Sequence, residues 1–102
     1  MSFNIAFVLY PDFEELDLAG PFEVFGVTAK WLDKEWRVFT VAGERSVRAV
    51  NGLSVQVDHV FADAPRAAVV VVPGGTGSDA AMKDAALVDY IKRAGEQASY
   101  VT

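Results

Sequence analysis

Two stretches of the chain are apolar at nearly every position, and this pattern constrains the fold more than any other feature. Residues 3–10 read FNIAFVLY, and residues 67–72 read AAVVVV. A strand with one face in water alternates apolar and polar side chains, whereas a strand covered on both faces stays apolar throughout. Both stretches therefore predict buried strands of a parallel sheet, with residues 3–10 at its centre.

Helical spacing follows each of these strands. After the acidic turn that begins at Pro11, apolar side chains recur on one helix face at Leu18, Phe22, Phe25 and Ala29. Gly20 and Pro21 lie early in this helix, where a missing N–H group costs least. A second helix, after residues 73–77, has one apolar face made of Leu87, Ile91, Ala94 and Ala98.

The remaining β-prone segments complete the topology. Residues 36–42 (WRVFTVA) predict a strand, residues 48–58 predict a hairpin with a tight turn at Asn51-Gly52, and residues 99–102 begin a last strand. This order of elements indicates an α/β fold of the flavodoxin-like type, with a parallel sheet sandwiched by helices. We interpret residues 1–102 as the N-terminal part of a single domain, whose sheet is incomplete and continues past Thr102.

Composition and charge argue against several classes of function. The 102 residues are 52% apolar, carry a formal net charge of −5, and contain no cysteine and one histidine, His59. Without a cluster of Lys and Arg, nucleic acid is not an expected partner. Without cysteine, and with one histidine, neither a disulfide nor a transition-metal site is expected. The N-terminal segment has neither a basic leader nor a membrane-spanning run, which predicts a cytoplasmic protein without a membrane partner.

Three carboxylates, Glu14, Glu15 and Asp17, follow the first predicted strand. Open α/β sheets bind their ligands beyond the carboxyl ends of the strands. A carboxyl group that lies beside another negative group, or away from water, holds its proton more tightly and can act as a proton donor. Acidic residues also favour the positive end of a helix, so a purely structural role for this cluster stays open.

The glycine-rich segment at residues 73–77 (PGGTG) follows the other buried strand. Adjacent glycines bring backbone N–H groups close to a ligand, as an oxyanion hole requires, but they also serve tight turns with positive φ. Residues 75–80 match the G-x-G-x-x-A pattern of dinucleotide-binding folds, with Glu96 near the distance of the acidic partner. That motif belongs to the first strand and helix of its fold, and Glu96 precedes the next strand, so nucleotide binding is disfavoured.

Taken together, these segments resemble the DJ-1/PfpI superfamily over essentially the whole chain. The resemblance rests on IAFVLYPDFEELDLAGPFEVF, RAVNGLSVQVDHVFADAP, VVVVPGGTG and the closing YVT, and it is strongest toward the isonitrile hydratase group. In that family a sharp turn after the last of these strands carries a nucleophilic cysteine, which the resemblance places beyond Thr102. It implies that Asp17 is the acidic partner, that Gly74, Gly75 and Thr76 form the oxyanion and substrate-binding loop, and that neither a metal nor a cofactor is required.

The activity implied by this resemblance is the hydration of isonitriles to N-substituted formamides through a cysteine thioimidate. The resemblance also implies a homodimer whose first helix lies near the interface. Two alternatives stay open: the sensory domain of an AraC-type transcription regulator, and another activity of the superfamily, such as that of a glyoxalase or a peptidase. The aspartate at position 17 favours the isonitrile hydratase group, because the other enzymes usually carry glutamate there.

Overall fold

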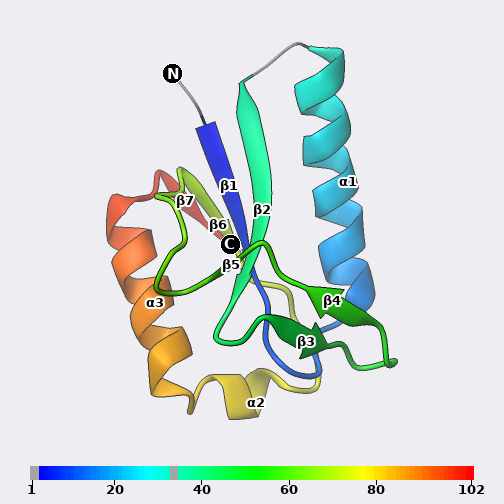
Figure 1. Cartoon of the computed structure of the whole chain (residues 1–102), viewed down its shortest axis with the longest axis vertical. Helices are drawn as coiled ribbons and strands as arrows, with labels where there is room; N and C mark the ends of the chain where they lie inside the picture. The colour runs from blue at the N-terminus through cyan, green and yellow to red at the C-terminus, as the bar shows by residue number, and fades with distance from the viewer. Residues whose placement is uncertain (1–2, 33–34) are drawn as a thin grey trace.

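The computed structural model describes residues 3–32 and 35–102, which form a parallel sheet with helices on both faces (Figure 1). The strands are β1 (Phe3–Val8), β2 (Trp36–Ala42), β5 (His59–Val60), β6 (Val69–Val71) and β7 (Tyr100–Val101), in the order β5-β2-β1-β6-β7. Helix α1 (Glu15–Trp31) lies on one side of the sheet, and α3 (Ala85–Gln97) lies on the other. This arrangement confirms the predicted α/β fold.

The apolar run at the N-terminus forms β1, the central strand. It pairs in parallel with β2, where Ile5 lies opposite Val38, and with β6, where Ile5 lies opposite Val69. Strands on both sides and helices on both faces leave four successive residues with no exposed surface, namely Ile5, Ala6, Phe7 and Val8. The prediction of a central strand covered on both faces is therefore confirmed.

Helix α1 packs on one face of the sheet through aromatic side chains. Phe7 of β1 contacts Phe22 and Phe25 of α1, with ring centroids 5.6 Å and 6.3 Å apart. Other large apolar side chains of α1 remain exposed: Leu16, Val24, Val27 and Trp31. The helix therefore carries more apolar surface than its contact with the sheet covers.

The predicted hairpin is present, but its turn differs from the expected one. Strands β3 (Ser46–Arg48) and β4 (Ser54–Gln56) pair antiparallel, so residues 49–53 form the connection. Within this connection only Gly52 has a positive φ, of 98°. A tight two-residue turn needs positive φ at Asn51 as well, so the expected turn type is wrong.

The second half of the chain contains two short elements that the sequence patterns did not predict. Strand β5 follows the hairpin, and α2 (Ser78–Ala81) precedes α3 as a separate helical turn. Both are shorter than the window over which hydrophobic periodicity can be read. The longer elements agree with expectation: α3 begins after Asp84, which caps the N–H groups of Ala86 and Leu87, and β7 pairs with β6.

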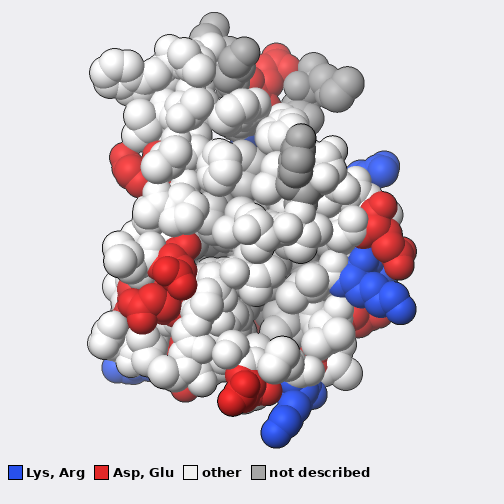
Figure 2. Space-filling model, turned by 180° about the vertical axis from the view of Figure 1, so that it is seen from behind, with Lys and Arg blue, Asp and Glu red and all other residues white. Residues whose placement is uncertain are grey.

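The molecular surface is unevenly charged. Seen from behind, the protein presents a broad uncharged area, with Lys and Arg at its margins and close to Asp and Glu (Figure 2). This face offers no continuous basic surface of the kind that binds a phosphate backbone. Among residues 3–32 and 35–102, no helix combines the length and the apolar character needed to cross a bilayer.

Candidate active site

Two loops meet at the carboxyl edge of the sheet, toward the lower end of the molecule in Figure 1. One leads from β1 into α1, and the other follows β6 and contains the glycine-rich segment. Their backbones are hydrogen-bonded directly, from Glu14 N–H to Gly74 O at 2.8 Å and from Gly77 N–H to Asp12 O at 3.2 Å. Segments that are far apart in the sequence thus form one continuous surface.

Asp17 reaches the glycine-rich loop with its side chain. Its Oδ2 atom accepts a hydrogen bond from Gly74 N–H at 3.1 Å. Glu15 is instead bound to the hairpin connection, where its carboxylate accepts hydrogen bonds from Asn51 N–H at 2.9 Å and Asn51 Nδ2 at 3.1 Å. Both acids lie in the first turn of α1, where the helix dipole favours them, but the dipole does not account for the bond to Gly74. The acidic cluster is therefore divided between two partners.

The peptide unit between Pro73 and Gly74 is held from both sides. The buried hydroxyl of Tyr10 donates a hydrogen bond to Pro73 O at 2.6 Å, while Gly74 N–H donates to Asp17. The carbonyl and N–H groups of a trans peptide unit point in opposite directions, so the two side chains fix its plane. Burial, and to a smaller extent the negative charge of Asp17, raises the pKa of Tyr10, which keeps its hydroxyl protonated as a donor.

Tyr10 holds the glycine-rich loop at this edge of the sheet, and the sequence analysis did not identify it as a site residue. Its ring continues the apolar run of residues 3–10, and the whole residue is only 4% exposed. A phenol inside such a run is a weak signal, since a buried hydroxyl needs a partner that the sequence does not name. The structure identifies this partner as the carbonyl group of Pro73.

Close backbone contact explains the glycines of the loop. Gly75 has a φ of 147°, and a Cβ atom there would lie 2.6 Å from Asp12 O and 2.7 Å from Glu14 N. Gly75 is therefore required by the turn, whatever its part in chemistry. In the part of the chain that the structure describes, the N–H groups of Gly75 and Thr76 donate no hydrogen bond to protein atoms. They are the backbone donors that a ligand at this edge can use.

The last residue of the chain returns to the same edge. Thr102 N–H donates to Val70 O at 2.8 Å, and Thr102 O accepts a hydrogen bond from Val72 N–H at 2.7 Å. Strand pairing thus extends beyond β7 to the residues that precede Pro73. Thr102 therefore lies beside the segment that leads into the glycine-rich loop.

An apolar hollow of about 140 Å³ adjoins this loop, and its lining includes Tyr10, Pro73, Gly74, Met82 and Leu87. Neither at this edge nor elsewhere in the described residues, 3–32 and 35–102, do three or more His, Cys, Asp or Glu side chains form a group that could hold a metal ion. The edge thus combines a carboxylate, backbone N–H donors and apolar surface.

A sequence model of the DJ-1/PfpI family matches residues 3–102, which include both loops and the strands that carry them. The chain belongs to the DJ-1/PfpI family. The resemblance drawn from the sequence motifs is therefore confirmed. The isonitrile hydratase of Pseudomonas putida is 32% identical over 103 residues, which cover 100% of this chain and 43% of that protein. The chain thus spans less than half the length of this relative.

Solved structures share the fold at low sequence identity. Oxidized DJ-1 of Toxoplasma gondii superposes with a TM-score of 0.76 at 18% identity, over 94% of this chain and 52% of that chain. A candidate transcriptional regulator from Vibrio parahaemolyticus superposes with a TM-score of 0.80 at 14% identity, over 98% of this chain and 55% of that chain. At these identities the likeness establishes the DJ-1-type fold and leaves the activity to be argued from the site.

The hydrogen bond of Tyr10 leads to a prediction about stability. We expect Tyr10→Phe to lower the free energy of unfolding by about 1–2 kcal/mol, because it leaves the buried Pro73 carbonyl without its donor. The matched control is Tyr90→Phe, which removes a hydroxyl from another buried ring for which the described residues offer no hydrogen-bond partner. Urea unfolding measures both changes, and equal effects of the two substitutions would contradict the prediction.

The contact between Glu15 and Asn51 predicts a pH dependence. Desolvation raises the pKa of Glu15, but hydrogen bonds from Asn51 and neighbouring backbone groups lower it by more, so the net pKa lies below its ordinary value of 4.5. A carboxyl group with a depressed pKa stabilises the fold above its unfolded-state pKa and loses this contribution as pH falls through the folded-state value. The stability advantage of the native protein over Glu15→Gln should therefore shrink below pH 4.5. Urea unfolding across this range measures it, and a constant difference would refute the expectation.

Proposed function

We propose that this chain is the N-terminal part of one DJ-1/PfpI domain that continues past Thr102, and that the protein hydrates isonitriles to N-substituted formamides. The observation that carries the proposal is the 3.1 Å contact of Asp17 with Gly74 N–H at the carboxyl edge. The 32% identity to an isonitrile hydratase supports the choice of substrate class. The apolar hollow beside Gly74 suits the alkyl or aryl substituent of an uncharged isonitrile.

The nucleophile in this proposal is a cysteine that follows Thr102, since the 102 residues contain none. The pairing of Thr102 with Val70 and Val72 supports this location, because a chain that continues in the same direction would lead toward the glycine-rich loop. A nucleophile there is close to Asp17, and hydrogen-bond reach between the two groups is the first requirement for acid-base catalysis.

The proposed reaction has two stages. The thiolate forms a C–S bond with the terminal isonitrile carbon, and this carbon receives a proton from the carboxyl group of Asp17, which gives a thioimidate. The Asp17 carboxylate then takes one proton from water as the water oxygen attacks the thioimidate carbon. The C–S bond breaks, the second proton of water ends on nitrogen, and the formamide and thiolate are released. The N–H groups of Gly75 and Thr76 stabilise the developing negative charge.

Incubation of the protein with an aryl isonitrile in water labelled with heavy oxygen tests this proposal. We expect mass spectrometry to show a formamide that contains one labelled oxygen, and rapid-quench samples to show a thioimidate adduct on a cysteine. A folded protein that converts neither alkyl nor aryl isonitriles would contradict the proposal. A basic helix-turn-helix domain after the DJ-1/PfpI domain would instead favour the sensory role in a transcription regulator.

The homodimer expected for this family is also a proposal, with α1 near the interface. Outside its contact with the sheet, α1 exposes Leu16 by 72%, Val24 by 63% and Trp31 by 84%. Apolar surface of this kind on one helix is typical of an area covered by another polypeptide. Native mass spectrometry should show dimers, and the double substitution Val24→Glu and Trp31→Glu should shift them to folded monomers. A native protein that is monomeric at every concentration would rule out the dimer.

A further inference from the structure

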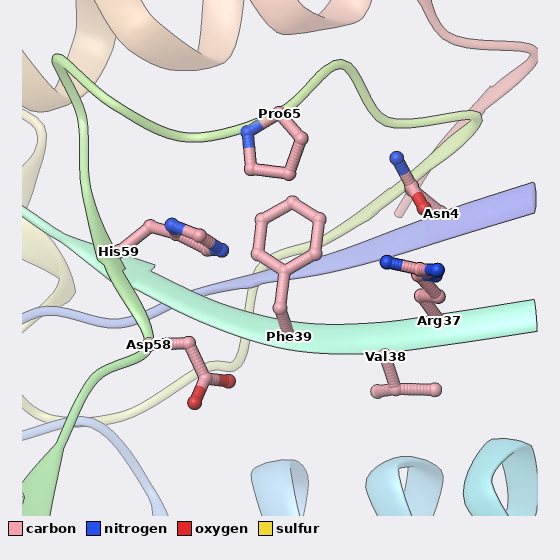
Figure 3. A pocket seen from close by; sticks show the side chains of 7 residues that line it. All are labelled: Asn4, Arg37, Val38, Phe39, Asp58, His59 and Pro65. Atoms are coloured by element: carbon pink, nitrogen blue, oxygen red, sulfur yellow. The ribbon is translucent and has the colours of Figure 1, made fainter.

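A second hollow lies on the sheet beside β2, away from the loops that carry Asp17 and Gly74. It has a volume of about 480 Å³, and its lining includes Asn4, Arg37, Phe39, Asp58, His59 and Pro65 (Figure 3). Asn4 and Arg37 lie opposite each other in the parallel register, near the amino ends of β1 and β2. The hollow therefore starts at the opposite end of the strands from the candidate active site and shares no lining residue with the apolar hollow there.

Three of the residues that line this hollow, Asn4, Arg37 and His59, have side chains with nitrogen atoms. Figure 3 shows Arg37 and His59 on either side of the Phe39 ring, with Asn4 next to Arg37. The amide of Asn4 is held in place, since its Nδ2 atom donates to Arg66 O at 2.8 Å. Arg37 forms no ion pair with any residue that the structure describes. Its guanidinium is therefore available to an anion.

Neither Asp58 nor Asp63 pairs with this guanidinium. Asp58 accepts hydrogen bonds from Thr40 N–H at 3.0 Å and Thr40 Oγ1 at 3.4 Å, and its carboxylate points to the other side of β2 (Figure 3). Asp63 lies 3.7 Å from Arg45 Nη2, with which it forms an ion pair, and 3.7 Å from His59 Nδ1. At this hollow Arg37 thus offers a guanidinium that no described residue pairs with, in a chain whose formal net charge is −5.

The part of the hollow between Arg37 and His59 is lined by the apolar rings of Phe39 and Pro65 (Figure 3). Phe39 packs edge to face against His59, with ring centroids 5.2 Å apart, and the ring of Pro65 lies across from Phe39 (Figure 3). A guanidinium binds a carboxylate through two parallel hydrogen bonds, and apolar walls bind the body of an organic ligand. We propose that this hollow binds a small organic carboxylate, with the carboxylate on Arg37 and an apolar body between Phe39 and Pro65.

Titration of isotope-labelled protein with benzoate, followed by the NMR shifts of backbone amides, tests this site. We expect saturable shifts at Arg37, Phe39 and His59, with a Kd in the millimolar range. Benzamide has the same ring without the charge, and inorganic phosphate has the charge without the ring. Each should bind at least about tenfold more weakly, because each lacks one of the two interactions.

Two variants assign the binding to the guanidinium. Arg37→Gln should weaken benzoate binding by at least about tenfold, and it should fold normally because Arg37 is exposed and has no ion pair within the described segments. Lys92→Gln removes one positive charge from an exposed position on α3 and should leave binding unchanged.

The proposal would be overturned by the absence of a saturable shift at the hollow, by equal binding of benzoate and benzamide, or by unchanged binding in Arg37→Gln. Binding of phosphate as tight as that of benzoate would also overturn it, because the apolar wall would then contribute nothing. All of these readouts are independent of isonitrile turnover, so the result stands whether or not the proposed function holds.

Discussion

Replacing Asp17 with Asn is expected to lower kcat for isonitrile hydration by about a hundredfold or more. The amide keeps the shape of the side chain and an oxygen that can accept the hydrogen bond from Gly74 N–H, which lies 3.1 Å from Asp17 Oδ2. It can neither give a proton to the isonitrile carbon nor take one from water. The loss therefore falls on proton transfer, while the contact between the two loops is retained.

The matched control for this experiment is Glu23→Gln, which removes the same charge from an exposed position of α1. Steady-state kinetics with an aryl isonitrile gives kcat and KM, and urea unfolding reports stability. We expect Glu23→Gln to keep its kcat. Asp17→Asn should lose about 1–2 kcal/mol of stability, because it weakens the hydrogen bond from Gly74 N–H and the interaction with the helix dipole, but it should stay folded. A native kcat in Asp17→Asn would remove this residue from the mechanism, and equal losses in both variants would point to a general effect of charge.

The largest loss of stability is expected from Gly77→Ala, at about 3 kcal/mol. A Cβ atom at this position would overlap the carbonyl oxygen of Pro11, and it would lie 3.0 Å from Asp12 Cβ. The obstacle is backbone, which cannot rotate away as a side chain can. The loop after β1 and the loop after β6 must therefore separate, which strains the 3.2 Å hydrogen bond from Gly77 N–H to Asp12 O.

Gly26→Ala is the matched control, because the same change of one methyl group meets open space and the next residue is Val27. A Cβ atom on Gly26 has no neighbour within 4 Å, and the residue lies inside α1. Alanine is favoured over glycine within a helix by about 0.5–1 kcal/mol, so this variant should be slightly more stable than the native protein. Urea unfolding of the three proteins measures both effects. If Gly77→Ala had native stability, the loops after β1 and β6 could separate without a loss of free energy of unfolding, and the prediction would be wrong.

Much of the fold was predictable because a strand that is buried on both faces has an apolar side chain at nearly every position of its sequence. The continuous apolar runs at residues 3–10 and 67–72 indicated β1 and β6, and helical spacing indicated α1 and α3. The placement of Asp17 near the glycine-rich segment was also predictable, because the carboxyl ends of parallel strands meet at one edge. Its bond to Gly74 agrees with that placement, and the catalytic roles of both residues stay predictions.

The turn of the hairpin is a feature that the local sequence pattern did not predict correctly. Asn51-Gly52 is a strong signal for a two-residue turn, yet residues 49–53 form the connection and Glu15 binds Asn51 through both its backbone and its side chain. Asn51 thus also makes a contact with a residue far away in the sequence, which the local pattern does not record. The same contact takes Glu15 out of the acidic cluster that spacing alone had suggested.

By itself, then, the sequence determined which segments are buried strands and helices, and which edge of the sheet carries Asp17 and the glycines. Only the tertiary structure decided which polar atoms meet, such as the hydroxyl of Tyr10 and Pro73 O at 2.6 Å. It alone brought Arg37 and His59 to one hollow. The physical reason is that the spacing of apolar side chains depends on which face of an element is buried. Which polar atoms meet depends instead on strand register and on loops that bring distant parts of the chain together.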